Sequence, residues 1–128
     1  MRNPARSFAG VFGAVYLFVG VVGFFVTGAS TATHQLVVFD LNALHNIVHL
    51  AIGALGLVAY AAGDSVSRKY ALGLAAVYGV VAIAGFAPQQ FLGIIPIGGA
   101  DIALHAATAI VALAAFRASA RQPSAARA

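Results

Sequence analysis

The chain has 128 residues, of which 62% are hydrophobic and 8% charged, and it carries a formal net charge of +4. So few polar side chains cannot cover a water-soluble globule of this length, which excludes an ordinary soluble domain. The absence of cysteine excludes disulfides and thiolate metal sites as well.

Four apolar segments follow one another along the chain, at residues 8–27, 42–62, 70–87 and 100–116. Each is long enough to cross a hydrocarbon core of about 30 Å as a helix. Transmembrane strands would need an alternation that none of the segments shows, and irregular backbone is excluded from lipid. The sequence therefore predicts one all-α domain over residues 1–117, an integral membrane four-helix bundle.

The connections between these segments differ in length and composition. The link 63–69 is short, which predicts that the second and third helices are antiparallel neighbours. The connections 28–41 and 88–99 are longer and partly apolar, so we expect them to lie in the membrane interface or to fold back over the bundle. The tail 118–128 is rich in Arg, Ser and Ala, and we expect it to be a disordered basic segment.

All basic residues fall on one side of this arrangement. They lie before the first segment, between the second and third, and after the fourth: Arg2, Arg6, Arg68, Lys69, Arg117, Arg121 and Arg127. The positive-inside rule then predicts a multi-pass protein of the cell membrane with both termini and the basic tail in the cytoplasm. The positive net charge is therefore explained by this topology. We expect lipid as the surrounding partner and no nucleic acid, because the tails lack interleaved aromatic residues.

Two short motifs occur twice in the chain. Residues 14–16 recur as residues 76–78, and residues 43–45 recur as residues 103–105, at nearly the same offset. The order of the matches predicts two copies of a helical hairpin. Because each copy crosses the membrane twice, both keep the same orientation, and the symmetry axis would run along the membrane normal.

Glycine is frequent inside the predicted helices, where it would weaken a helix in water. In lipid, small residues let helix backbones approach one another. These glycines do not follow the four-residue spacing of the usual dimer motif. We therefore expect them to pack helices within this one bundle.

A polar cluster is predicted at the outer ends of the second and fourth helices. Helical spacing places Asn42, His45, Asn46 and His49 on one face, and Asp101 and His105 lie one turn apart. Under the repeat, His45 and His105 are symmetry mates. We predict a metal site formed by His45, His49, Asp101 and His105, in which Asn42 and Asn46 orient the imidazoles. Nitrogen and oxygen ligands without sulfur suit zinc or another divalent transition metal.

Other functions for the same residues stay open. The histidines could form a structural hydrogen-bond network in a non-catalytic accessory or scaffold subunit, in a homo-oligomer or a larger membrane complex. Two histidines on facing helices could instead ligate haem b. A proton path is poorly supported because the polar groups occupy only the outer half. His34 and Asp40 are expected to be solvated loop residues. We do not predict an enzyme, because the known nucleophile, phosphate-loop and zinc-protease motifs do not occur.

The residues of this cluster also resemble a known family. The stretch LNALHNIVHL at residues 41–50, followed by Gly53, and the block DIALH at residues 101–105 are similar to the two signature stretches of an actinobacterial membrane family, domain-of-unknown-function family 4383. The similarity covers nearly the whole chain up to Phe116. It implies a four-helix membrane protein and supplies no activity.

Overall fold

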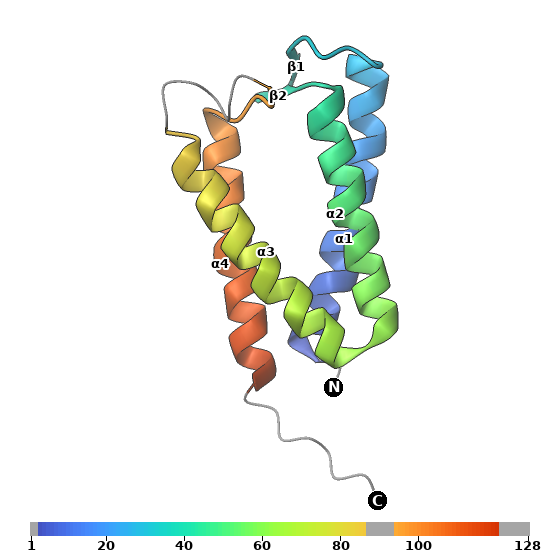
Figure 1. Ribbon diagram of the computed structural model, residues 1–128, viewed down its shortest axis with the longest axis vertical. Helices are drawn as coiled ribbons and strands as arrows, with labels where there is room; N and C mark the ends of the chain where they lie inside the picture. Colours follow the sequence, from blue (N-terminus) through green and yellow to red (C-terminus); the bar gives the residue numbers. More distant parts are fainter. Residues whose placement is uncertain (1–2, 87–93, 121–128) are drawn as a thin grey trace, which may run out of the picture.

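The computed structural model describes residues 3–86 and 94–120 of the chain (Figure 1). Four helices and one pair of short strands follow in the order α1 (Pro4–Thr27), β1 (His34–Leu36), β2 (Phe39–Leu41), α2 (Ala43–Ala62), α3 (Asp64–Ala84) and α4 (Ala100–Ala120). All four helices are long and apolar enough to cross a membrane. The predicted all-α four-helix architecture is confirmed.

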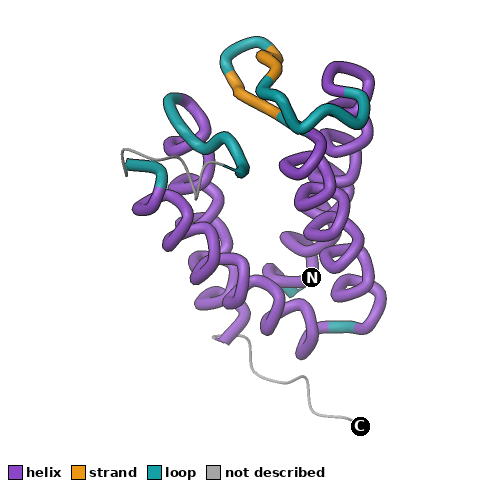
Figure 2. The backbone as a smooth tube through the Cα atoms, turned by 45° about the horizontal axis from the view of Figure 1, so that its top comes forward, coloured by secondary structure: helices purple, strands orange, loops and turns teal. Residues whose placement is uncertain are grey.

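The helices pack as two hairpins, α1 with α2 and α3 with α4. We call the end of the bundle that carries β1 and β2 the strand end, and the opposite end, where α1 begins and α4 ends, the terminal end. α2 and α3 meet at the terminal end and diverge towards the strand end, as the ribbon and the tube view both show (Figures 1 and 2). The predicted antiparallel neighbours are therefore in contact mainly near their connection.

Several helices are longer than the sequence predicts. α1 begins at Pro4 because Asn3 caps it, its side chain accepting a hydrogen bond from the backbone N–H of Ala5. α3 begins at Asp64 and not at residue 70, so the predicted link 63–69 is reduced to Gly63. Gly63 has a φ of 105°, which an L side chain rarely adopts, and this conformation allows a one-residue turn.

The tail was predicted to start at residue 118, but α4 continues to Ala120. Its last turn is joined to the start of α1: Oγ of Ser119 accepts from the backbone N–H of Ala5 at 2.7 Å and lies 2.6 Å from Oδ1 of Asn3. The rest of the predicted disordered tail, residues 121–128, lies outside the described residues, as do residues 87–93. The terminal end is therefore closed by contacts between the first and last helices.

The bundle has polar groups inside and apolar groups outside. Asn42, Asn46 and Asp101 are buried, whereas large apolar side chains of α1 such as Phe18 and Phe25 are 69% and 85% exposed. Water would strongly disfavour such a surface, but hydrocarbon does not. This distribution agrees with helices that span a bilayer.

Glycine lets α1 and α2 pack backbone against backbone. A Cβ atom added to Gly53 would lie 2.5 Å from the backbone nitrogen of Leu17, and one added to Gly13 would lie 2.8 Å from that of Leu57. Only the absence of a side chain permits this approach. The close packing predicted for the helical glycines is confirmed at Gly13 and Gly53, and it fixes α2, which carries two of the candidate ligands, firmly against α1. The prediction is wrong for Gly73 and Gly79, where an added Cβ would meet no described atom within 4 Å.

The connection between α1 and α2 folds into a small antiparallel hairpin that the sequence analysis did not predict. His34 pairs with Leu41 and Leu36 with Phe39. β1 contacts α1 and β2 contacts α4, so the hairpin bridges the two halves of the bundle at the strand end. As expected, this connection folds back over the helices. Three-residue strands are too short to give a recognisable alternation in the sequence.

Residues matched by the internal repeat face each other between the two hairpins. The ring centroids of Tyr16 and Tyr78 are 5.7 Å apart, and those of His45 and His105 are 6.5 Å apart. Repeat mates must approach one another near a symmetry axis, so an axis between the hairpins would explain both contacts. Duplication itself stays a prediction.

Candidate metal centre

Two helix starts at the strand end position the polar cluster. Asn42 is the N-cap of α2, and Oδ1 of its side chain accepts from the backbone N–H of His45 at 2.9 Å. The cap places His45 in the first turn of α2. Asp101 lies in the first turn of α4, and His105 follows one turn later on the same face.

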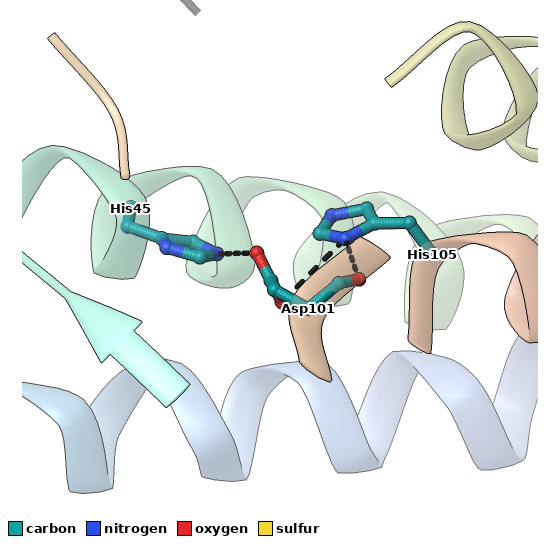
Figure 3. A group of neighbouring side chains, drawn as sticks. All are labelled: His45, Asp101 and His105. Carbon is teal, nitrogen blue, oxygen red and sulfur yellow. Dashed lines mark hydrogen bonds and ion pairs between the residues drawn. The ribbon is translucent and has the colours of Figure 1, made fainter. Parts of the chain in front are cut away.

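His45, Asp101 and His105 converge on one buried point. Each offers one ligand atom, and these three atoms lie within 4.8 Å of one another. Nε2 of His45 is 4.0 Å from Oδ2 of Asp101, and Nδ1 of His105 is 3.5 Å from Oδ1 of Asp101 (Figure 3). Three of the four predicted ligands therefore meet, and they come from two helices that belong to different hairpins.

A hydrogen bond fixes the tautomer of His105. Its Nδ1 lies 2.7 Å from the backbone carbonyl oxygen of Asp101. A carbonyl oxygen can only accept, so Nδ1 must carry the proton, and Nε2 then has a free lone pair. Metal-bound histidines are usually held in this way, with one ring nitrogen donating to a backbone carbonyl.

His49 lies beside this trio. Among the described residues, the ligand atoms that come within 4.8 Å of one another belong to His45, Asp101 and His105, and not to His49. Its ring centroid is 4.6 Å from that of His45 and 5.3 Å from that of Tyr16, with the rings edge to face in both pairs. A fourth ligand at His49 would need a different rotamer. Its membership of the site stays a prediction.

Several buried polar atoms of the cluster have no hydrogen-bond partner among the described residues: Nδ1 of His45, Nδ1 of His49, Oδ1 of Asn46 and Oδ2 of Asp101. Buried polar atoms are nearly always paired in folded proteins, because leaving one unpaired costs about 1–3 kcal/mol. Four such atoms in one place indicate that the protein alone does not satisfy this cluster.

The two amides contact groups other than the imidazole rings. Nδ2 of Asn42 donates to the carbonyls of Thr31 (3.2 Å) and Ile94 (2.8 Å), and Nδ2 of Asn46 donates to Oγ1 of Thr27 at 2.8 Å. Asn42 thus orders the backbone of His45 and ties the two connections at the strand end together. That these amides orient the imidazole rings stays a prediction.

Three further residues surround the cluster and were not assigned to it from the sequence. The hydroxyl groups of Tyr16 and Thr108 are 3.3 Å apart, and the ring of Tyr78 stacks on that of His105 with centroids 4.8 Å apart. Thr108 continues the stripe of Asp101 and His105 along α4 at helical spacing, which is a signal that the sequence offered. His34 and Asp40 lie in β1 and β2 and are half-buried, not fully solvated as expected.

Comparison with protein families matches residues 6–117 to the family described as Domain of unknown function (DUF4383). The match covers all four helices apart from a few terminal residues. No curated protein and no solved structure matches the chain.

Proposed function

Because the chain belongs to the DUF4383 family, whose function is unknown, its role must be inferred from the site, and we propose that it binds a divalent metal ion, zinc in the first place. The observation that carries the proposal is the buried trio of His45, Asp101 and His105, whose ligand atoms lie within 4.8 Å of one another. A cation there would pair Oδ2 of Asp101, which has no hydrogen-bond partner among the described residues.

The spacing of the ligand atoms is close to that of a zinc shell. Ligands about 2.0–2.2 Å from a tetrahedral ion lie about 3.3–3.6 Å from one another. The 4.0 Å between Nε2 of His45 and Oδ2 of Asp101 needs a small contraction. His105 would bind through its unprotonated Nε2, because the Nδ1 that lies 3.5 Å from Asp101 carries the proton. Two imidazoles and one carboxylate suit zinc better than calcium, which takes six to eight oxygen ligands.

The fourth position of such a shell would be open to water, or to His49 after a rotamer change. Three protein ligands with one open position are typical of zinc sites that bind or activate a further molecule. A closed four-ligand shell is typical of structural sites. A His49→Ala variant distinguishes the open shell from the closed one. The variant should bind zinc more weakly than the wild type only if His49 is the fourth ligand.

The geometry supports the metal better than the two alternatives. Haem would need a porphyrin between two histidines, but Asp101 lies between His45 and His105 (Figure 3). A purely structural network should pair its buried polar atoms, and four atoms of this cluster have no partner within the described ranges.

Zinc titration of purified, chelator-treated protein in detergent tests the proposal. We expect about one zinc per chain for the wild type. The variants Asp101→Asn and His105→Gln should bind at least about a hundredfold more weakly, because even loss of an outer partner costs 10–100-fold. His34→Ala, which removes a histidine outside the trio, is the matched control. Equal uptake by the wild type and a His45→Ala, His105→Ala variant would contradict the proposal.

We also infer that the terminal end faces the cytoplasm across the cell membrane, so that the metal site lies near the outer surface. The described basic residues Arg6, Arg68, Lys69 and Arg117 begin α1 and α3 or end α4, all at the terminal end. Reporter fusions after Ala32 and after Ala128 test this orientation. An external signal from the fusion after Ala128 would reverse it.

A further inference from the structure

A cavity of about 200 Å³ lies next to the metal trio, between α2 and α3. Its walls are apolar, formed by Val48 and Ile52 of α2 and by Val77 and Val81 of α3, and residues 95 and 97 cover it at the strand end. His49 and Tyr78 also line it, together with two members of the trio, His45 and His105. The cavity is thus a mostly apolar chamber with one polar wall.

The chamber opens sideways, towards lipid. Val48 and Val77 line it and are also 40% and 53% exposed, so they form its rim. Both belong to helices long and apolar enough to span the membrane, and they diverge here (Figure 1). At 1.5 Å per residue, Val48 lies about 8 Å below the start of α2, at the depth of the hydrocarbon.

The polar wall offers a hydrogen-bonding group that the protein leaves unused. His49 is only 7% exposed, and its Nδ1 has no hydrogen-bond partner in the part of the chain that the structure describes. His49 is also not needed for the trio of His45, Asp101 and His105. If the imidazole turned towards the cavity, a ligand oxygen would pair this buried nitrogen, whereas a hydrocarbon chain would leave it unpaired.

We propose that this cavity binds the ring head group of a lipid-soluble quinone or quinol, with an oxygen of the ring bonded to His49 and the apolar tail leaving between Val48 and Val77. Size supports one ring: an apolar cavity of about 150 Å³ in another protein holds benzene, so about 200 Å³ holds one substituted six-membered ring. The inference goes beyond the metal site and does not require a bound metal, although His45 and His105 belong to both the trio and the lining of the cavity.

Duroquinone is a suitable probe because its fully methylated ring does not add to amines. The protein, reconstituted in phosphatidylcholine nanodiscs with a chelator present, has four tyrosines and no tryptophan, so binding can be followed by quenching of tyrosine fluorescence. We expect saturable binding of one quinone per chain. Durene, the same methylated ring without the oxygens, should fail to compete.

Matched variants test the location. Val77→Phe should fill the chamber and weaken binding about tenfold or more, whereas Val80→Phe, on the same helix but outside the lining, should leave it unchanged. His49→Phe keeps a flat ring but removes the nitrogen, and should weaken binding about threefold to tenfold. Circular dichroism and size exclusion check that each variant is folded.

Three outcomes would overturn the inference. Quenching that rises linearly without saturation would show partition into the bilayer only. Equal affinities of Val77→Phe and Val80→Phe would remove the cavity as the location. Displacement of duroquinone by an equal concentration of durene would show that the site recognises apolar volume and not an oxygen. Because the metal is chelated throughout, none of these results bears on zinc binding.

Discussion

The two helical hairpins have similar lengths and compositions but pack in different ways. In the α1–α2 hairpin, glycines lie in the interface between the two helices, which we call the seam. The backbones of Gly13 and Gly53 therefore approach the opposite helix directly. In the α3–α4 hairpin, a Cβ added to Gly73 or Gly79 would meet no described atom within 4 Å. Gly85, at the end of α3, does approach α4, but an added Cβ would there meet the side chain of Ile102 and not backbone. Close backbone contact through glycine is thus described only for the α1–α2 hairpin.

This difference divides the candidate site into two halves. His45 and His49 stand on α2, which is fixed against α1 through backbone contacts. Asp101 and His105 stand on α4, and neither Gly73 nor Gly79 of its partner α3 makes such a backbone contact. We therefore expect the half of the site on α2 to be held more rigidly, because of where the glycines lie relative to the neighbour helix and not because of their number.

The largest expected effect comes from adding one methyl group to the seam. Gly53→Ala should lower the free energy of unfolding by about 2–3 kcal/mol, because the obstacles to the new Cβ are the backbone atoms of Leu17 and Gly13. Gly79→Ala should leave it unchanged or raise it by up to about 1 kcal/mol through helix propensity. Denaturant unfolding in detergent micelles measures both. A loss of stability in Gly79→Ala equal to that in Gly53→Ala would remove the proposed asymmetry.

A smaller effect is expected at the link between the two halves. Asn42 caps α2 and donates to carbonyls of both connections at the strand end, so Asn42→Ala should cost about 1–2 kcal/mol. Asn42→Ser keeps a capping oxygen and should cost about 1 kcal/mol less. Thermal unfolding of the two variants gives the comparison, and equal losses would show that the cap itself contributes nothing.

The smallest effect is expected at the hydroxyl contact between the hairpins. Tyr16 of α1 and Thr108 of α4 meet at 3.3 Å, which is long for a bond between hydroxyl groups. A double-mutant cycle of Tyr16→Phe and Thr108→Val should give a coupling free energy of about 0.6 kcal/mol, the usual value within membranes. A coupling above about 2 kcal/mol would mean that this contact, and not the seam, organises the bundle.

The sequence predicts the helices and the meeting of His45, Asp101 and His105 because both follow from periodicity. Apolar runs of membrane length indicate the spans, and ligands one helical turn apart share a face. The repeated Ala-Leu-His motif also predicts that α2 and α4 approach each other at the site, because repeat mates lie close together near a symmetry axis. These features depend on local spacing, which a single sequence contains.

What the sequence could not predict depends on tertiary contacts or on single dihedral angles. The early start of α3 depends on the positive φ of Gly63, and neither that angle nor the three-residue strands leave a periodic trace. The partners of Asn42 and Asn46 lie on segments far along the chain. The lateral cavity exists because α2 and α3 diverge, an angle set by packing and not by composition.

The one-residue turn at Gly63 joins α2 to α3 at the terminal end, so a rotation about this turn would move the strand end farthest. The centre of such a rotation would lie at the terminal end, where Ser119 joins α4 to α1, and the candidate ligands lie at the strand end. At 1.5 Å per residue, His45 is about 27 Å from Gly63, so a rotation of about 3° moves it by about 1.4 Å. That movement is as large as the contraction from 4.8 Å to the spacing of a zinc shell. A rotation too small to disturb any helix would therefore be enough to bind or release a metal ion at the strand end.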